Sequence, residues 1–92
     1  MKYHVADIDV LDFLSYLLID RKYSNNTVMS YDLQLYELEQ FAHKPLRHLT
    51  SGDITAFLAK RKEKNQARTI AHFMTVFRSF YKFLEIEEVL SK

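Results

Sequence analysis

The sequence predicts an all-α domain, folded as a compact bundle of four or five helices. Its 92 residues suffice for one small domain with a single core. The composition, 48% hydrophobic and 27% charged, is that of a globular chain and not of a disordered one. With one glycine and one proline, the chain lacks the turn residues that a sandwich or barrel of short strands requires. Packed helices are therefore the expected architecture.

The first helix is expected to begin at Asp7 or Asp9 and to end at Lys22. Either aspartate can cap the first free N–H groups, and Arg21 and Lys22 suit the negative end of the helix dipole. Apolar residues recur at the spacing of one buried helix face: Val10, Phe13, Leu14, Leu17 and Leu18.

The second helix is expected to begin within the dense cluster of capping residues from Ser24 to Thr27. Its apolar residues again follow every three or four positions: Val28, Tyr31, Leu35, Leu38, and Phe41 or Ala42. Pro45 should end it, because proline disfavours helical geometry at the preceding residue and has no N–H to donate.

A short loop from His43 to Leu49 should lead into a third helix. Thr50 and Asp53 have the spacing of a capping box, in which each side chain bonds the other's backbone N–H. The apolar stripe of this helix is short: Ile54, Phe57 and Leu58. We expect the helix to fray through the lysines at positions 60–64 into a turn near Asn65.

The fourth helix, predicted to begin near Gln66 and to end near Leu84, is the most apolar of all. Its stripe comprises Ile70, Phe73, Met74, Phe77, Phe80, Tyr81 and Leu84, widened by Val76 and Phe83. Such a broad stripe predicts a central helix covered on two sides by the others. The pattern also allows a short fifth helix from Glu85 to Leu90.

The composition excludes several classes of protein. Without cysteine, there can be no disulfide scaffold, thiolate metal site or cysteine nucleophile. No apolar run approaches the roughly 18 residues of a membrane span, and the first ten residues lack the apolar stretch of a secretory signal. We therefore expect a soluble, cytoplasmic chain with no membrane partner.

The sequence gives no sign of catalysis or of a cofactor. It contains neither a glycine-rich phosphate loop nor an H-E-x-x-H motif. His4, His43, His48 and His72 each lack a partner at the spacing of helical metal ligands. We expect no metal, no cofactor, no small-molecule substrate and no enzymatic activity of the chain itself.

The net charge of +1 conceals a strong asymmetry. Residues 60–82 hold seven basic residues and one acid, whereas residues 1–59 have a net charge of −3. A field concentrated in this way attracts a polyanion, although lysines near a helix end are also common on ordinary solvated surfaces.

The predicted fourth helix carries a polar, basic strip. Arg68, His72, Thr75, Ser79 and Lys82 are spaced four, three, four and three residues apart, which puts them on one face. Lysines precede the start of this helix, and a helix N-terminus attracts phosphate. Arginine, histidine and threonine can also contact base edges in a major groove. Duplex DNA is therefore a candidate partner.

Four segments match a family pattern in the correct order. Residues 13–27 follow FL..L....g.S.nT; residues 27–41 follow T...Y...L..l..f; residues 49–58 follow lt..di..fl; and residues 69–84 follow T.......lrsFy.fl. From Val10 to Glu88 the chain resembles the amino-terminal core-binding domain of tyrosine recombinases, the phage-integrase and Xer-type enzymes that cut and rejoin DNA.

The resemblance implies a SAM-like bundle that forms half of a clamp around a recombination site, with the second and fourth helices facing the major groove. In this family a separate carboxy-terminal domain carries the Arg/Lys/His/Arg set and the nucleophilic tyrosine. That domain is absent from these 92 residues, so an excised domain or a truncated relative that does not cleave DNA is expected. Asp32 departs from the pattern, and we expect it to repel phosphate from the second helix.

These inferences predict a single DNA-binding domain over residues 1–92, which positions a recombinase on DNA beside other recombinase protomers. The phosphate contacts are predicted at Lys60, Lys62, Lys64, Arg68, Arg78 and Lys82. The closer groove contacts are predicted at Thr27, Ser30, Gln66, Thr69 and His72.

Two alternatives remain at this stage. A helical protein-interaction module, similar to SAM-domain or death-domain adaptors, would ignore DNA and use an apolar patch or complementary charges. A free-standing helix-turn-helix regulator is less favoured, because the loop between the second and third helices lacks the glycine that often occurs in its tight turn.

Overall fold

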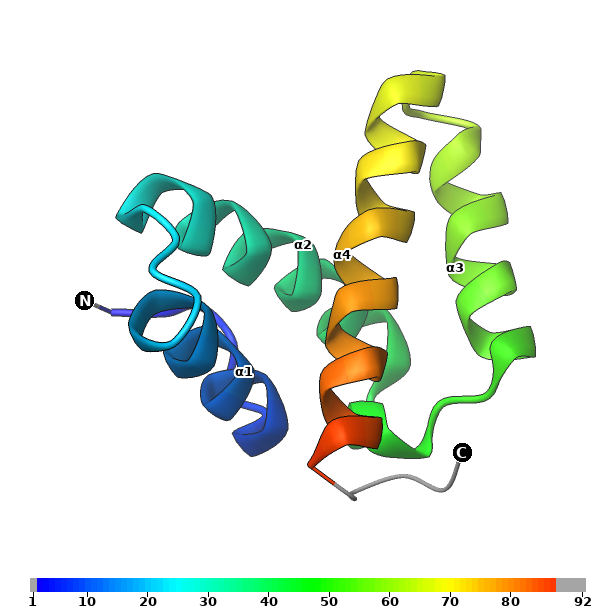
Figure 1. Ribbon diagram of the computed structural model, residues 1–92. Helices are drawn as coiled ribbons and strands as arrows, with labels where there is room; N and C mark the ends of the chain where they lie inside the picture. Colours follow the sequence, from blue (N-terminus) through cyan, green and yellow to red (C-terminus); the bar gives the residue numbers. More distant parts are fainter. Residues whose placement is uncertain (1, 88–92) are drawn as a thin grey trace.

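Every regular element of the computed structural model, which describes residues 2–87, is a helix. The elements are α1 (Ile8–Ile19), α2 (Asn25–Ala42), the short 3-10 helix η1 (Leu46–His48), α3 (Ser51–Lys62) and α4 (Ala67–Ile86). Figure 1 shows α4 standing between the α1–α2 pair on one side and α3 on the other. The all-α prediction and the central place of the fourth helix are confirmed.

The predicted fifth helix does not begin at Glu85. Both Glu85 and Ile86 continue α4, which therefore extends two residues beyond the predicted end. The remainder of the predicted fifth helix, residues 88–90, lies outside the described residues.

Side-chain caps begin three of the four α-helices. The Asp7 carboxylate accepts from the backbone N–H groups of the first turn of α1, and Ser24 accepts from the Thr27 N–H. At α3 the predicted capping box is confirmed, with distances of 2.9 and 3.1 Å between Thr50 and Asp53. The capping residues in the sequence therefore fix where these helices begin.

Two details of α1 correct the prediction. The helix ends at Ile19 and not at Lys22, because Lys22 has a φ of 56° in the left-handed region and turns the chain. Asp9 does not cap the helix. Its buried carboxylate instead accepts two hydrogen bonds of 2.8 Å from the Arg47 guanidinium, which ties α1 to η1.

Within the single hydrophobic core, the aromatic side chains form two groups joined by α4. In one, Phe13 of α1 packs against Phe80 and Phe83, with ring centroids 5.5 and 5.3 Å apart. In the other, Phe57 of α3 packs edge-on against Phe73 and Phe77 of α4. One helix thus supplies both halves of the core, as its broad stripe predicted.

A few positions of the predicted apolar stripes differ. Met74 is 42% exposed, because it lies at the edge of the α4 stripe. Tyr31 is buried, whereas Tyr81 is half-buried and its hydroxyl donates a 2.7 Å hydrogen bond to the Leu46 carbonyl. Burial raises the pKa of Tyr81 well above its usual range, so it stays protonated as a donor.

The segment before α1 is part of the packed structure. Val5 is buried, and the His4 and Val5 N–H groups donate to the Asp32 carboxylate of α2 at 3.0 and 3.1 Å. Glu39 accepts from the next two N–H groups, those of Ala6 and Asp7. Carboxylates of α2 therefore bind the backbone N–H groups of an N-terminal segment that is not part of any described helix.

The expected repulsion of phosphate by Asp32 is wrong. The Asp32 side chain is fully buried and also lies 2.8 Å from His4 Nδ1. It faces the N-terminal segment, because it follows Tyr31 by one residue and so lies about 100° further around the helix.

No described helix has the length and apolarity to span a bilayer.

Candidate nucleic-acid interface

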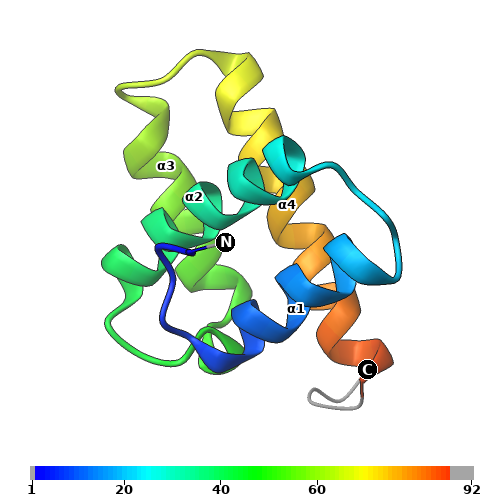
Figure 2. The same cartoon turned by 90° about the vertical axis from the view of Figure 1, so that its left-hand side faces the viewer.

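Helices α2 and α4 cross steeply, and Figure 2 shows α2 passing in front of α4 with α1 below it. At the crossing, the Tyr31 ring of α2 meets the His72 ring of α4 edge-on, with centroids 6.3 Å apart. The Ser79 hydroxyl, two turns along α4, also interacts with Tyr31, whose pKa is raised chiefly by burial. The polar strip of α4 therefore passes α2 at Tyr31.

This arrangement defines what we term the α2–α4 face. Its members are Thr27 and Ser30 of α2, and Arg68, His72, Thr75, Ser79 and Lys82 of α4. Thr27 lies one turn before Tyr31 on the same side of α2, whereas Ser30 directly precedes Tyr31 and lies about 100° around the helix from it. Ser30 and Ser79 are half-buried, and the other five are exposed. Two separate helices thus present hydroxyl, imidazole and cationic groups together.

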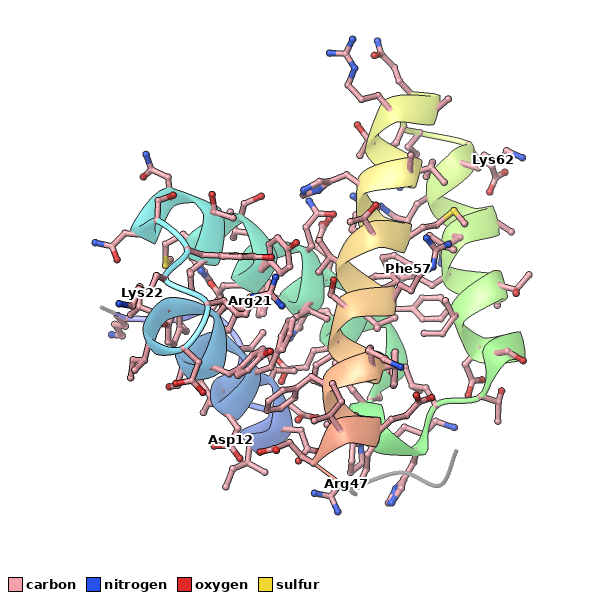
Figure 3. All side chains as sticks on the ribbon, in the orientation of Figure 1. Asp12, Arg21, Lys22, Arg47, Phe57 and Lys62 are labelled. Carbon is pink, nitrogen blue, oxygen red and sulfur yellow. The ribbon has the colours of Figure 1, made fainter. Side chains whose placement is uncertain are left out.

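The other predicted phosphate contacts lie elsewhere. Lys60 and Lys64 line a groove between α3 and α2. Arg78 lines an apolar groove between α3 and α4, beside Ile54 and Phe77. Lys62 projects from the side of α3 that is turned away from α2 (Figure 3). The structure therefore divides the basic segment among several surfaces, which linear spacing across the 63–66 turn could not reveal.

The two remaining predicted groove residues stand at the start of α4. Gln66 is exposed at the N-cap position, and its side chain makes no capping hydrogen bond. Thr69 is half-buried. Within the described residues, α4 is thus the one α-helix without a side-chain cap, and its first N–H groups stay free for another acceptor.

The basic residues of positions 60–82 are largely without acidic partners. Arg61 bonds Glu37 at 2.8 Å. Within residues 2–87, none of the other six lies within ion-pair distance of a carboxylate. The remaining ion pairs of the described chain, such as Lys44 with Asp53, lie outside this segment. Ion pairs within the described chain therefore leave most of this positive charge uncompensated.

Sequence reasoning missed Arg21 as a member of this region. The residue was assigned to the end of the first helix, but the helix stops two residues earlier. Its guanidinium lies 5.7 Å from the centre of the Tyr23 ring, and Tyr23 in turn meets Tyr31 at 6.0 Å. The signal was present at Lys22, where the quoted pattern has a glycine, the residue that most readily takes a left-handed conformation.

The described residues offer no obvious metal centre. No group of three or more histidine and carboxylate side chains among them is placed to hold an ion. The two buried carboxylates, Asp9 and Asp32, are both occupied by internal donors.

Comparison with known proteins bears directly on this helical arrangement. Residues 10–88 match the family described as phage integrase, N-terminal SAM-like domain. The chain belongs to this family. The matched span includes the four α-helices of the described residues except the first two residues of α1, and with them the whole α2–α4 face.

Individual relatives agree with the family match. The integrase domain is 34% identical over 85 residues to tyrosine recombinase XerC of Bacillus licheniformis, an alignment covering 87% of the chain and 28% of the relative. It is 38% identical over 95 residues to tyrosine recombinase XerC of Rickettsia typhi, covering 88% and 31%. The chain thus spans under a third of the length of these relatives. No solved structure matches it significantly.

Proposed function

We propose that this integrase domain binds duplex DNA through the α2–α4 face and positions a tyrosine recombinase on its recombination site. The observation that carries the proposal is the polar strip of α4, which combines exposed cations without described acidic partners and hydroxyl groups beside the start of α2. Family membership supports the same function, because the matched relatives are recombinases by name.

The length of the strip suits a major groove. Arg68 and Lys82 are 14 residues apart, or about 21 Å along a helix. A major groove is about 12 Å wide, so two cations at this separation can reach phosphates on its opposite walls. His72 and Thr75 lie between them, where a side chain would meet base edges. The cations would therefore supply affinity, and the residues between them would set the register of the domain on the DNA.

Helix α2 would approach the same groove by its N-terminal half. Thr27 and Ser30 supply hydroxyl groups there, and the carboxylate of Asp32 is buried on another side of the helix. The free N–H groups at the start of α4 would add a neutral phosphate contact near Arg68. Lys60 and Lys64, in the neighbouring groove, would extend the positive field toward flanking phosphates.

The proposed role is positioning and not chemistry. Strand cleavage and joining would belong to a catalytic domain outside the matched residues, and other protomers would bind beside this one on the site. Such a domain would act in the cytoplasm, where bacterial DNA lies.

The test is a pair of double charge reversals with the same change in net charge. We expect Arg68→Glu with Lys82→Glu to weaken binding of the 92-residue chain to a short duplex by at least about tenfold, since two phosphate contacts become repulsive. Fluorescence anisotropy at fixed salt measures the affinity, and circular dichroism checks that the helices persist.

The matched control is Lys62→Glu with Arg78→Glu, which reverses two exposed cations on other surfaces. A clearly smaller loss is expected for this pair. Equal losses from both pairs would mean that overall charge, and not the α2–α4 face, governs binding. A folded wild-type chain that binds no duplex but self-associates would favour the protein-interaction alternative.

A further inference from the structure

The turn between α1 and α2 fixes the direction in which Arg21 extends. The Arg21 N–H donates to the Tyr16 carbonyl at 3.1 Å, and the Tyr23 N–H donates to the Leu17 carbonyl at 2.9 Å. Between them, Lys22 takes a left-handed conformation. Figure 3 shows the outcome: Arg21 lies toward α4, whereas Lys22 lies on the outer side of the molecule.

Aromatic side chains hold the Arg21 guanidinium in place. It lies over the Tyr23 ring, and an interaction with the Tyr16 hydroxyl raises the pKa of Arg21 above its usual value. Tyr16 is itself fixed, because its ring packs on Phe83 of α4 with centroids 5.1 Å apart. These two contacts favour one direction of the exposed Arg21 side chain, which reduces the entropy lost when a ligand binds it.

No described carboxylate compensates this ordered charge. Arg47 and Arg61, the two arginines that ion pairs hold in place, lie against Asp9 and Glu37. Arg21 forms no ion pair with any residue from 2 to 87. Neutral phenol groups orient its guanidinium and leave most of its N–H donors free. A guanidinium with free N–H donors can bind an anion.

The position of Arg21 connects it to the α2–α4 face. Tyr23 meets Tyr31, and Tyr31 interacts with Ser79, so a row of tyrosines leads from Arg21 to the polar strip of α4. Lys82 follows Ser79 by one turn on that strip. Arg21 therefore flanks the face on the α1 side, across from the α3–α4 turn that carries the lysines.

We propose that Arg21 binds a backbone phosphate of the duplex that crosses the α2–α4 face, with Tyr16 and Tyr23 as positioning residues. This inference rests on the proposed function and deepens it. The guanidinium presents two parallel N–H groups, which suit two oxygens of one phosphate. The DNA would then be held from both flanks of the face, by Arg21 on one side and by the start of α4 on the other.

Side-chain NMR of the arginine Nε–Hε groups tests the proposal in the whole 92-residue chain. On titration with a short duplex, we expect the Arg21 signal to shift together with that of Arg68. The signals of Arg47 and Arg61 should stay in place, because carboxylates already occupy those guanidinium groups. These two arginines are internal controls in the same sample.

Variants supply the second readout. Arg21→Ala should weaken duplex binding about tenfold and make the salt slope shallower by about one, since one phosphate contact is lost. Tyr16→Phe keeps the charge and should weaken binding less, with the slope unchanged. The control Lys44→Ala removes one exposed cation near Asp53 and should leave both quantities nearly unaltered.

The outcomes separate the two proposals. If the Arg68 signal shifts and the Arg21 signal does not, and Arg21→Ala binds as wild type, the Arg21 site is wrong and the α2–α4 face stands. If neither signal moves at duplex concentrations that saturate a related recombinase, the proposed function fails, and the Arg21 site fails with it.

Discussion

Asp32 shows how one carboxylate organises the start of this domain. Its side chain is fully buried, yet it accepts from the backbone N–H groups of His4 and Val5 and lies 2.8 Å from His4 Nδ1. Burial of an ionised group is tolerated when several donors surround it. The residue thus anchors the N-terminal segment to α2, and it keeps a negative charge away from the surface proposed to meet DNA.

We expect Asp32→Ala to lower the free energy of unfolding by about 2–3 kcal/mol, because it removes a charged acceptor and leaves buried N–H groups unpaired. Urea denaturation measures the change. Asp32→Asn keeps one acceptor oxygen and should cost less. Asp12→Ala, on the exposed side of α1, is the control and should be nearly neutral. A neutral Asp32→Ala would contradict the anchoring role.

At the scale of single elements, capping chemistry sets the helix starts. The α3 capping box gives Asp53 a backbone hydrogen bond from Thr50, which lowers the pKa of the Asp53 carboxyl below its usual 3.8. A carboxyl with a lowered pKa in the folded state stabilises that state above its unfolded pKa. This contribution is lost as the pH falls through the folded value.

Asp53→Asn should therefore lower the urea midpoint at pH 7 and have a smaller effect at pH 2.5, where a larger fraction of the wild-type carboxyl is protonated. Denaturation of both proteins at the two pH values provides the test. Asp12→Asn is the matched control, and its effect should not depend on pH in this way. An Asp53→Asn effect that is as large at pH 2.5 as at pH 7 would show that the charge does not stabilise the cap.

The elements also show what sequence alone can reach. Helix starts and the central place of α4 were predictable, because capping residues and apolar period are local signals. The end of α1 was not, since Lys22 takes a conformation usually left to glycine. Nor were the Asp9–Arg47 pair and the Asp32 contacts, because they join residues 38 and 28 positions apart.

The candidate site was predictable in part for the same reason. The polar strip on α4 could be predicted because its residues recur every three or four positions within a single helix. The structure leaves Arg68, His72, Thr75 and Lys82 exposed. The spacing of residues within one helix does not show how α3 and α4 are oriented to each other. Lys62 and Arg78 were therefore grouped with cations that lie on other surfaces. Arg21 needed the tertiary arrangement to be found.

For the whole molecule, folding separates the two kinds of charge. Several acids of the first half are used internally: Asp7 caps α1, Glu39 and Asp32 hold the N-terminal segment, and Asp9 binds Arg47. The basic residues of 60–82 mostly lack such partners within the described chain. Although the net charge is only +1, these basic residues, spread over several surfaces, are the physical basis for attracting a polyanion.

The dependence of duplex binding on salt tests this central claim most directly. If the domain neutralises about four to six phosphates, the logarithm of the association constant should fall with the logarithm of salt concentration at a slope of about −4 to −5. Anisotropy titrations of the 92-residue chain between low and physiological salt give this slope. A slope near zero, with binding retained, would contradict the account.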